Sequence, residues 1–542
     1  MAQKIIIPFL WLLVLQSCTV RKKAELIVFN GRIYTVNDSS KVQQAMAIKA
    51  GKILETGSTE FILQNYRSAA KIDLADKTVL PGLIDAHCHF TGYATDMWKC
   101  DLTGTDSFEE VIERTMVYAE KAPMYWIYGR GWDQNDWETK DYPDKATLDR
   151  LFPDRPVFLK RIDGHAALVN QTALDLAGIT KKTKVKGGEV QLKEGELTGL
   201  LIDNAMDLVD RIVPPISDSL ATAYYLKAQQ TCFSYGLTQV QDCGITEHTA
   251  QLVDKELEEG RLKIKVFAFL SDEPAYYEKW LKKGVYRNGS FTVGGFKLYA
   301  DGALGSRGAC LLSPYHDKKN WFGFMLRDHN YLADVAQKLV NSNLQLCTHA
   351  IGDSANRAML NIYGRVLQGK SNKRWRIEHA QVVNERDFHL FGDLGVIPSV
   401  QPTHATSDMY WAEERLGKER TENAYAYRKL LRSAGILPLG TDFPVEDISP
   451  FKTFYAAVSR KDKDNFPEGG FYAGEALSRE QALRGMTIWA SYAIFEDHKK
   501  GSLEKNKAAD FIIIDRDIMT CEEKEILQTR VLATFIDGEK VY

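Results

Sequence analysis

The fold is decided by one stretch of the sequence, Val79-Leu80-Pro81-Gly82-Leu83-Ile84-Asp85-Ala86-His87-Cys88-His89. This apolar run has the length of a strand and ends in two histidines separated by one residue. Side chains alternate along a strand, so the two imidazoles lie on the same face. Because neutral imidazole is a common metal ligand, the pair predicts one edge of a metal site.

Four later strand-like runs also end in a side chain that can hold or bridge a metal ion. They are Phe296-Lys297-Leu298-Tyr299, Leu344-Gln345-Leu346-Cys347-Thr348-His349, Trp375-Arg376-Ile377-Glu378-His379 and Ile436-Leu437-Pro438-Leu439-Gly440-Thr441-Asp442. Ligands at the carboxyl ends of successive parallel strands describe the mouth of a barrel. The sequence therefore predicts a metal centre at that mouth.

Eight segments in the middle of the chain have the apolar character of strands. They span 82–89, 237–242, 264–270, 295–301, 344–349, 375–379, 396–401 and 436–442. From the second segment onward, most are separated by stretches with helical periodicity, such as 331–340 and 355–367. This alternation predicts an α/β fold with a (β/α)8 TIM-like barrel over residues 81–499.

The gap between the first and second strand candidates is too long for a single helix. Residues 98–220 are therefore expected to form a lobe inserted into the barrel. The lobe leaves from the carboxyl end of the first strand, which is the catalytic face of such barrels. We expect it to roof the site.

Both ends of the chain have short strands separated by turn residues. Residues 24–80 contain the turns Asn30-Gly31 and Ala50-Gly51, and residues 500–542 contain two further apolar runs. Hairpins of this kind are typical of a small β-sheet domain. We expect the two ends to join in one β-sandwich that flanks the barrel.

Composition excludes several classes of function. The chain has 542 residues, of which 44% are hydrophobic, so it is long enough for more than one domain. Its formal net charge of −3 offers no basic face, and we expect no nucleic-acid partner. We expect a small-molecule partner instead, and a homo-oligomer stays possible.

The amino terminus resembles a bacterial lipoprotein signal. Lys4 precedes the apolar run 5–15, which is followed by Leu15-Gln16-Ser17-Cys18. This pattern predicts a signal over residues 1–18 with Cys18 as the lipidated residue, and places the protein in the bacterial cell envelope, on the periplasmic side or the outer membrane. An ordinary cleaved signal or an uncleaved anchor stays open. The apolar run is shorter than the ~20 residues that span a bilayer, so we expect membrane contact only through the lipid.

The predicted ligands form a chemically coherent set. His87, His89, His349 and His379 supply imidazole nitrogens and Asp442 supplies a carboxylate, which suits zinc or a similar divalent ion. Lys297 is the exception, because a protonated lysine is repelled by a metal ion. A lysine that has reacted with carbon dioxide carries a carbamate that can bridge two ions, whereas an unmodified lysine fits a site with one ion.

This ordered set resembles the amidohydrolase superfamily over nearly all of the chain after the signal. The superfamily pattern is His-x-His on the first strand, a lysine on the fourth, histidines on the fifth and sixth, and an aspartate on the eighth. The branch that contains N-substituted formamide deformylases is indicated by five motifs, namely Asp163-Gly164-His165-Ala166, Asp301-Gly302-Ala303-Leu304-Gly305-Ser306, Thr348-His349-Ala350-Ile351-Gly352-Asp353, Glu378-His379-Ala380-Gln381 and Gly440-Thr441-Asp442-Phe443-Pro444-Val445-Glu446.

The resemblance implies hydrolysis by metal-activated water. His87 and His89 would hold one ion and His349 and His379 a second, with carbamylated Lys297 between them. Asp442 would ligate metal, accept the proton of the attacking water and deliver it to the leaving amine.

Further residues are candidates for contact with the substrate. His165 in the lobe is expected to act on the substrate or the developing oxyanion, with stabilisation of the lobe as the alternative. His404, Arg307 and Trp132 are candidate substrate-binding residues, for which a structural role in a loop or the core is the competing interpretation.

The function predicted from these features is hydrolysis of a C–N bond other than a peptide bond, in an N-acyl or N-formyl amide. Hydrolysis of a cyclic amide, carbamate or ester, or deamination of a ring, stays open at the same site. A lipid-anchored small-molecule binding protein is the non-enzyme alternative, and it gives no reason for a proton-shuttling Asp442.

Overall fold

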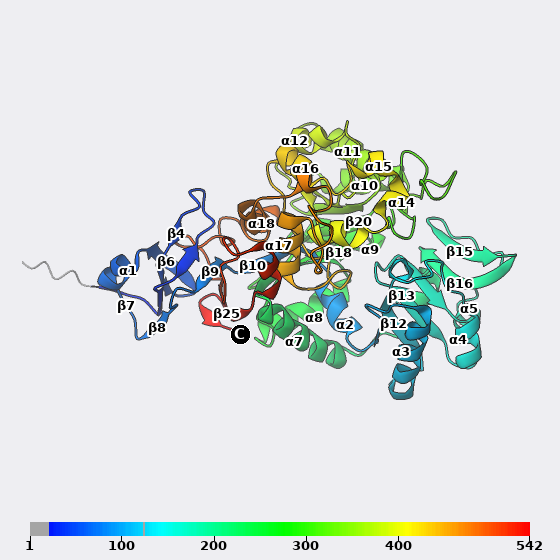
Figure 1. Cartoon of the computed structure of the whole chain (residues 1–542), viewed down its shortest axis with the longest axis horizontal. Helices are drawn as coiled ribbons and strands as arrows, with labels where there is room; N and C mark the ends of the chain where they lie inside the picture. Colours follow the sequence, from blue (N-terminus) through cyan, green and yellow to red (C-terminus); the bar gives the residue numbers. More distant parts are fainter. Residues whose placement is uncertain (1–20, 123–124) are drawn as a thin grey trace, which may run out of the picture.

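A computed structural model describes residues 21–122 and 125–542, and its centre is a parallel β-barrel (Figure 1). Seven strands follow one another around it in the order β10-β17-β18-β20-β21-β22-β23, all parallel. Their bounds are Leu83–Cys88, Leu237–Ile245, Lys265–Ser271, Phe291–Tyr299, Gln345–Ala350, Arg376–His379 and Ile397–Ser399. Every barrel strand is almost entirely buried, as expected for a sheet whose outer face is covered by helices.

The eighth position of the barrel is occupied by residues 437–442, which differ from the expectation because they form no regular strand. The segment still bonds to both neighbours. The Gly440 amide donates to Val400 on one side, and the Ala86 amide donates to Leu439 on the other. Pro438 has no amide hydrogen, and a Cβ at Gly440 would lie 2.5 Å from the His87 nitrogen. The ladder is therefore irregular here, while the ring is closed.

Helices cover the outside of the barrel. They include α7 (Asp218–Ser234), α8 (Glu247–Glu258), α10 (His329–Leu339) and α11 (Asp353–Leu367). A side chain caps the first turn of three of them, since Ser217, Thr246 and Asp328 accept from backbone amides. Their apolar faces pack on the strands in one continuous core that includes Phe296, Leu346 and Ile377.

Two small sheets at one end of the molecule are built from both ends of the chain, as Figure 1 shows in blue and red. Four strands form the order β6-β5-β2-β8, bounded by Lys52–Gly57, Ala45–Lys49, Leu26–Phe29 and Ala70–Asp73. Six form the order β26-β25-β24-β9-β3-β4, bounded by Glu539–Lys540, Val531–Ile536, Phe511–Ile514, Thr78–Pro81, Arg32–Tyr34 and Val42–Gln43. Strand β9 continues directly into barrel strand β10, so the sandwich and barrel share one stretch of chain.

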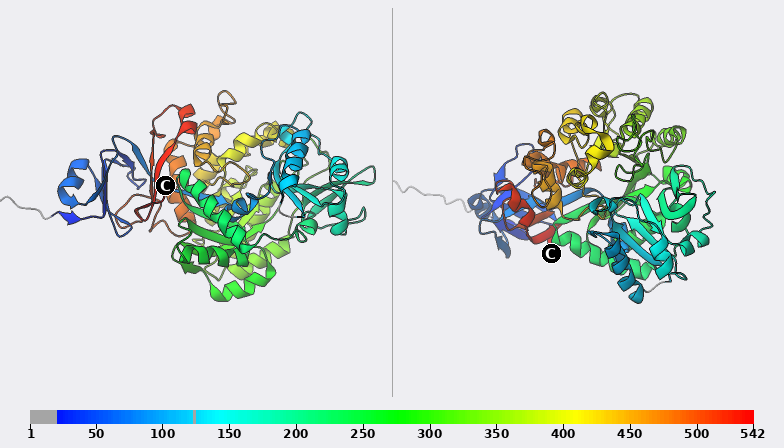
Figure 2. Two further views of the ribbon diagram at one scale, coloured as in Figure 1. Left: turned by 90° about the horizontal axis from the view of Figure 1, so that it is seen from below. Right: turned by 45° about the vertical axis from the view of Figure 1, so that its right-hand side comes forward.

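The inserted lobe lies at the opposite end of the molecule from the sandwich (Figures 1 and 2). Its six-stranded sheet has the order β11-β12-β13-β14-β16-β15, with bounds Cys100–Asp101, Ile127–Trp132, Val157–Arg161, Ala166–Val169, Glu196–Asp203 and Gly188–Lys193. Two apolar clusters form on the lobe, one around Phe158 and one around Trp132. The prediction of a TIM-like barrel with a flanking sandwich and an inserted lobe is confirmed.

Over residues 21–122 and 125–542, we find no helix with the length and apolar character needed to span a membrane. The predicted lipidation residue, Cys18, lies outside the residues that the structure describes.

Candidate metal centre

The predicted ligands converge at the carboxyl ends of the barrel strands. His87 lies in β10 and His89 directly after it, while Lys297, His349 and His379 lie at or near the ends of β20, β21 and β22. Asp442 ends the closing segment, where its amide donates to the carbonyl of His87. These side chains line the floor of a cavity of about 500 Å³ between the barrel and the lobe, except for His87, which lies beneath it.

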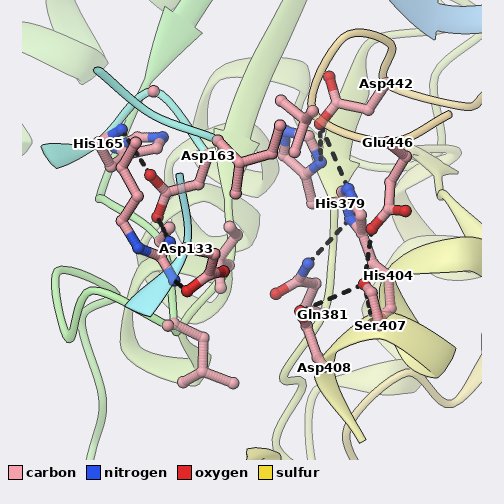
Figure 3. A pocket seen from close by; sticks show the side chains of 18 of the residues that line it. Asp133, Asp163, His165, His379, Gln381, His404, Ser407, Asp408, Asp442 and Glu446 are labelled. Carbon is pink, nitrogen blue, oxygen red and sulfur yellow. Dashed lines mark hydrogen bonds and ion pairs between the residues drawn. The ribbon is translucent and has the colours of Figure 1, made fainter. Parts of the chain in front are cut away.

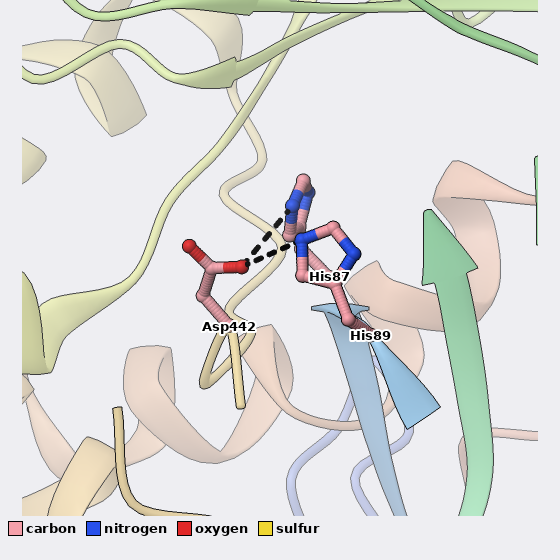
Figure 4. A group of neighbouring side chains, drawn as sticks. All are labelled: His87, His89 and Asp442. Atoms are coloured by element: carbon pink, nitrogen blue, oxygen red, sulfur yellow. Dashed lines mark ion pairs between the residues drawn. The ribbon is translucent and has the colours of Figure 1, made fainter. Parts of the chain in front are cut away.

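Asp442 faces the two histidines of the first strand (Figure 4) and lies near that of the sixth. Its Oδ1 is 3.2 Å from His89 Nε2 and 3.5 Å from His87 Nε2, and its Oδ2 is 3.8 Å from His379 Nδ1. The imidazole ring of His379 is 4.8 Å from that of His87 and 4.7 Å from that of His349, between centroids. One compact cluster therefore contains nitrogen donors from three strands around a single carboxylate.

Burial keeps the central imidazoles neutral. It lowers the pKa of His87 to about 4, with a further contribution from Lys297. Burial also holds the pKa of His349 and of His379 well below the usual value. A neutral imidazole has a free lone pair, so at neutral pH these side chains are ready to act as ligands.

A buried carboxylate fixes the orientation of His87. Glu378 Oε2 is 2.5 Å from His87 Nδ1, which leaves Nε2 facing Asp442. Burial disfavours a charge on Glu378, but Arg376 and His87 bring its pKa below its usual range. Arg376 also donates to the carbonyl of Ala86 and to Ser399. A carboxylate behind a histidine is the usual partner of a metal-binding imidazole.

His379 has a similar partner from the next strand. Its Nδ1 is 2.8 Å from Gln401 Oε1, at the end of β23. This contact orients the ring, as Glu378 does for His87. Neither partner was identified from the sequence, and the only available signal was their position beside a ligand or at a strand end.

Lys297 is fully enclosed by the centre. Its Nζ is 3.4 Å from His87 Nε2 and 4.6 Å from the centre of the Tyr299 ring. Among the described residues, no carboxylate lies within ion-pair distance of this amine. A buried lysine in this position fits modification to a carbamate, because a metal ion would then provide the missing counter-charge.

The donor set fits a divalent metal ion. Asp442 Oδ1 is buried and has no hydrogen-bond donor in the described part of the chain, although two imidazole nitrogens flank it. His87, His89 and Asp442 offer atoms within 4.8 Å of one another, and so do His379, His404 and Asp442. Nitrogen and carboxylate ligands in this number are those preferred by zinc and similar ions.

The two other predicted histidines border the cavity. His165, from the lobe, lies 5.2 Å from His349 between ring centroids, and its Nδ1 is 2.6 Å from Asp203 Oδ1. Burial lowers the pKa of His165, but Asp203 outweighs it and the net shift is upward. His404 lies in the first turn of helix α13 (Pro402–Asp408), which follows β23, and its Nε2 is 3.5 Å from Asp442 Oδ2. Both can reach a substrate carbonyl above the ligands.

Two predicted substrate contacts lie elsewhere. Arg307 is paired with Asp317 at 2.9 Å and does not line the cavity. Trp132 is buried in the lobe, where its indole nitrogen donates to the carbonyl of Leu159 and its ring packs near Trp137. The charge of Arg307 and the aromatic ring of Trp132 suggested contact with the substrate. In the structure, the charge is instead paired within the loop and the ring is packed inside the lobe. Trp411 lines the cavity instead.

A parallel barrel with histidines, a lysine and an aspartate at its strand ends is the framework of a metal-dependent hydrolase. A model of the amidohydrolase family matches residues 70–542. The chain therefore belongs to the amidohydrolase family.

Named relatives cover almost the whole chain. Protein LONG AFTER FAR-RED 3 of Arabidopsis thaliana is 33% identical over 96% of this chain and 92% of its own length. The putative amidohydrolase YtcJ of Bacillus subtilis is 30% identical over 94% of this chain and 98% of its own length. The N-substituted formamide deformylase of Arthrobacter pascens is 26% identical over 95% and 97%.

A solved structure has the same fold. An uncharacterized metal-dependent hydrolase from Pyrococcus horikoshii superposes with a TM-score of 0.75 at 28% sequence identity, covering 92% of this chain and 99% of the other. Together with the family match, this similarity supports the conclusion that the chain is a metal-dependent hydrolase.

Proposed function

We propose that this protein hydrolyses a C–N bond other than a peptide bond, in an N-acyl or N-formyl amide. The observation that carries the proposal is the position of Asp442, whose carboxylate is flanked by His87, His89 and His404 at the floor of the cavity between the barrel and the lobe. The similarity to an N-substituted formamide deformylase favours this bond over the ester and ring substrates.

In this proposal the metal, with zinc as the expected ion, is held by His87, His89, Lys297, His349, His379 and Asp442. The set could hold one or two ions, and a carbamate on Lys297 would serve as a shared ligand if there were two. Such an ion acidifies water and polarises a carbonyl group.

The chain's own residues then move the proton. Asp442 accepts the proton of the attacking water. It is ionised beforehand, because burial disfavours its charge but His87, His89 and His379 outweigh burial and hold its pKa well below the usual value. After the attack, Asp442 returns the proton to the leaving nitrogen. His165 and His404 orient the substrate carbonyl and donate to its oxygen as negative charge develops.

The test combines metal content with turnover. The form lacking residues 1–18 is analysed by elemental mass spectrometry and assayed against a panel of N-acyl and N-formyl amines. We expect one to two equivalents of metal and turnover that is lost on chelation. Absence of metal after reconstitution would refute the ligand assignment and leave a small-molecule binding protein.

Asp442→Asn separates hydrolysis from simple capture. The amide cannot accept the proton, so turnover should fall by roughly a thousandfold. If the protein only captured a small molecule, the parent and the Asp442→Asn variant would bind it equally well. Turnover of the variant at the parent rate would exclude Asp442 as the proton carrier.

We also propose that the protein is anchored to the bacterial cell envelope through a lipid on Cys18. Cells grown with labelled palmitate should label the parent protein and not Cys18→Ala, which should appear in the soluble fraction. Equal labelling of both proteins would refute the anchor.

A further inference from the structure

The cavity above the metal centre has an acidic side. Asp408 and Glu446 are half-buried in its wall, and Asp136 from the lobe stands exposed at its rim. Asp408 ends helix α13 (Pro402–Asp408), and Glu446 follows Asp442 in the loop after the closing segment. These carboxylates therefore face the same space as the ligands, but they are not ligands themselves (Figure 3).

Only neutral hydroxyl groups hold the two inner carboxylates. The Ser407 hydroxyl donates to Glu446 Oε1 at 2.6 Å and lies 3.5 Å from Asp408 Oδ1. The Tyr425 hydroxyl donates to Asp408 Oδ2 at 2.7 Å. In the described residues no lysine, arginine or histidine is within ion-pair distance of either group.

Lys297 is the one lysine or arginine of the cavity that has no carboxylate partner among the described residues, and it lies on the floor beside His87. The other three are paired with other acids. Arg161 binds Asp133 and Asp163 together. Arg130 is 3.0 Å from Asp96, and Lys160 is 2.8 Å from Asp210. None of these cations is available to Asp408 or Glu446, so these two carboxyl groups have no cationic partner in the described part of the protein.

A second observation points to a ligand that donates hydrogen bonds. Gln381 is only 5% exposed, and its amide nitrogen is 3.0 Å from His404 Nδ1. Its Oε1 is buried and has no donor among the residues of the described chain. Figure 3 shows this oxygen pointing into the cavity. An unpaired buried acceptor is costly, and an N–H group of a bound molecule would satisfy it.

The carboxylates are poorly suited to a bare metal ion. Every three-ligand group close enough to hold an ion in the described residues includes His87 or Asp442 and therefore belongs to the metal centre. Burial raises the pKa of Asp408 to about 7 and that of Glu446 to about 8. A polyatomic cation with several N–H donors would favour the charged forms and reach both groups at once.

We propose that the substrate carries an ammonium or guanidinium group that binds Asp408, Glu446 and the Gln381 carbonyl oxygen, while its amide faces Asp442. The inference rests on the proposed amide hydrolysis and names the class of substrate for it. Asp136 at the rim attracts the same positive charge on entry.

The first experiment measures binding without turnover. Butylguanidinium and its neutral isostere butylurea are titrated into the metal-loaded protein by calorimetry. We expect at least a roughly tenfold preference for the cation, because charge-assisted hydrogen bonds are stronger than neutral ones. The double variant Asp408→Asn, Glu446→Gln should lose the preference, and each single variant should lose part of it.

The matched control is Asp447→Asn. It removes one charge from the residue next to Glu446, but Asp447 is exposed, is paired with Lys452 and does not line this cavity. The control should keep the preference. Equal affinity for butylguanidinium and butylurea in the parent, or an unchanged preference in the folded double variant, would overturn the proposal.

The second experiment uses hydrolysis to separate the two proposals. The monoformyl derivative of 1,4-diaminobutane is compared with N-pentylformamide, in which a methyl group replaces the ammonium. A higher kcat/KM for the cationic substrate, reduced in the double variant, supports both. If neither compound is hydrolysed but butylguanidinium is preferred, the amidase proposal fails and the cation site stands. If both are hydrolysed equally, the cation site fails.

Discussion

His87 illustrates how much of a metal site depends on the residue behind the ligand. The imidazole is presented by strand β10, but its direction is fixed by Glu378 on β22, and Glu378 is fixed in turn by Arg376 on the same strand. All three side chains are fully buried. The charge of Glu378 also makes Nε2, the ring nitrogen that faces Asp442, a better metal ligand.

We therefore predict that Glu378→Gln lowers metal affinity by roughly tenfold to a hundredfold. The measurement is competition with a chelator of known affinity. The control is Glu496→Gln, which removes a buried carboxylate paired with Lys500 and Gln239 near the start of β17. If both variants lose the same metal affinity, the effect is general destabilisation and the orienting role of Glu378 is refuted.

Glu446 predicts a pH dependence of stability. Burial raises its pKa to about 8 from the usual 4.5, so in the folded protein it keeps a proton that the unfolded chain loses earlier. The free energy of unfolding should fall as pH rises between these values. Glu446→Gln should therefore gain stability relative to the parent as pH rises, as measured by denaturation at acidic, neutral and alkaline pH. A constant difference in the free energy of unfolding between the parent and the variant across this pH range would contradict the prediction.

The residues that could be predicted from the sequence are those whose position within a strand identifies them. His87 and His89 are two apart, and His349, His379 and Asp442 end apolar runs, so their shared location follows from the barrel. Glu378, Gln381 and Gln401 were missed as partners because their contacts join distant parts of the chain. Sequence spacing carries no information about such contacts.

Among the elements, the start of strand β18 joins the barrel to the sandwich. Lys265 is buried, and its Nζ is 2.8 Å from Asp510, before β24, and 2.8 Å from Asp537, after β25. The same lysine therefore anchors a barrel strand to both strands of the carboxyl-terminal hairpin. A buried charge that loses its partners is strongly destabilising.

We predict that Lys265→Met destabilises the protein by about 3 kcal/mol, because the carboxylate of Asp510 would remain buried without its cation. Chemical denaturation followed by tryptophan fluorescence measures the effect. Lys263→Met is the control, since Lys263 and Glu539 form an exposed pair at 3.6 Å that should contribute less than about 1 kcal/mol. Equal losses would show that the buried network has no special role.

The closing segment shows where element prediction from sequence fails. Residues 436–442 have the same apolar pattern as the other strand candidates, and they do occupy the expected place. Pro438 and the close approach of Gly440 to His87 prevent a regular ladder. Periodicity identifies burial on both faces, but hydrogen bonding between particular strands is decided by contacts that only the assembled barrel contains.

At the scale of the whole molecule, the proposed metal joins the first strand and the closing segment to the fourth, fifth and sixth strands across the barrel. Its ligands come from the first, fourth, fifth and sixth strands and from the closing segment. A metal that binds only the folded state stabilises it, by about 2.7 kcal/mol when its free concentration is a hundred times the Kd.

Thermal unfolding should therefore depend on free zinc. We expect Tm to rise with free zinc concentration in the parent and to stay nearly constant in the double variant His87→Ala, His89→Ala. Differential scanning calorimetry in zinc buffers gives both curves. A parent Tm that does not change with zinc would contradict a metal shared by these strands.

The pairing of β9 with β24 also affects how the chain is made. Strand β9 leads directly into the first barrel strand, but its partner Phe511–Ile514 is synthesised only after all the barrel strands. Until then one edge of β9 is unpaired, and such an edge invites association with other chains. Slow translation of the segment that contains β24, or its loss, should therefore send this protein to chaperones or inclusion bodies rather than to a shortened active form.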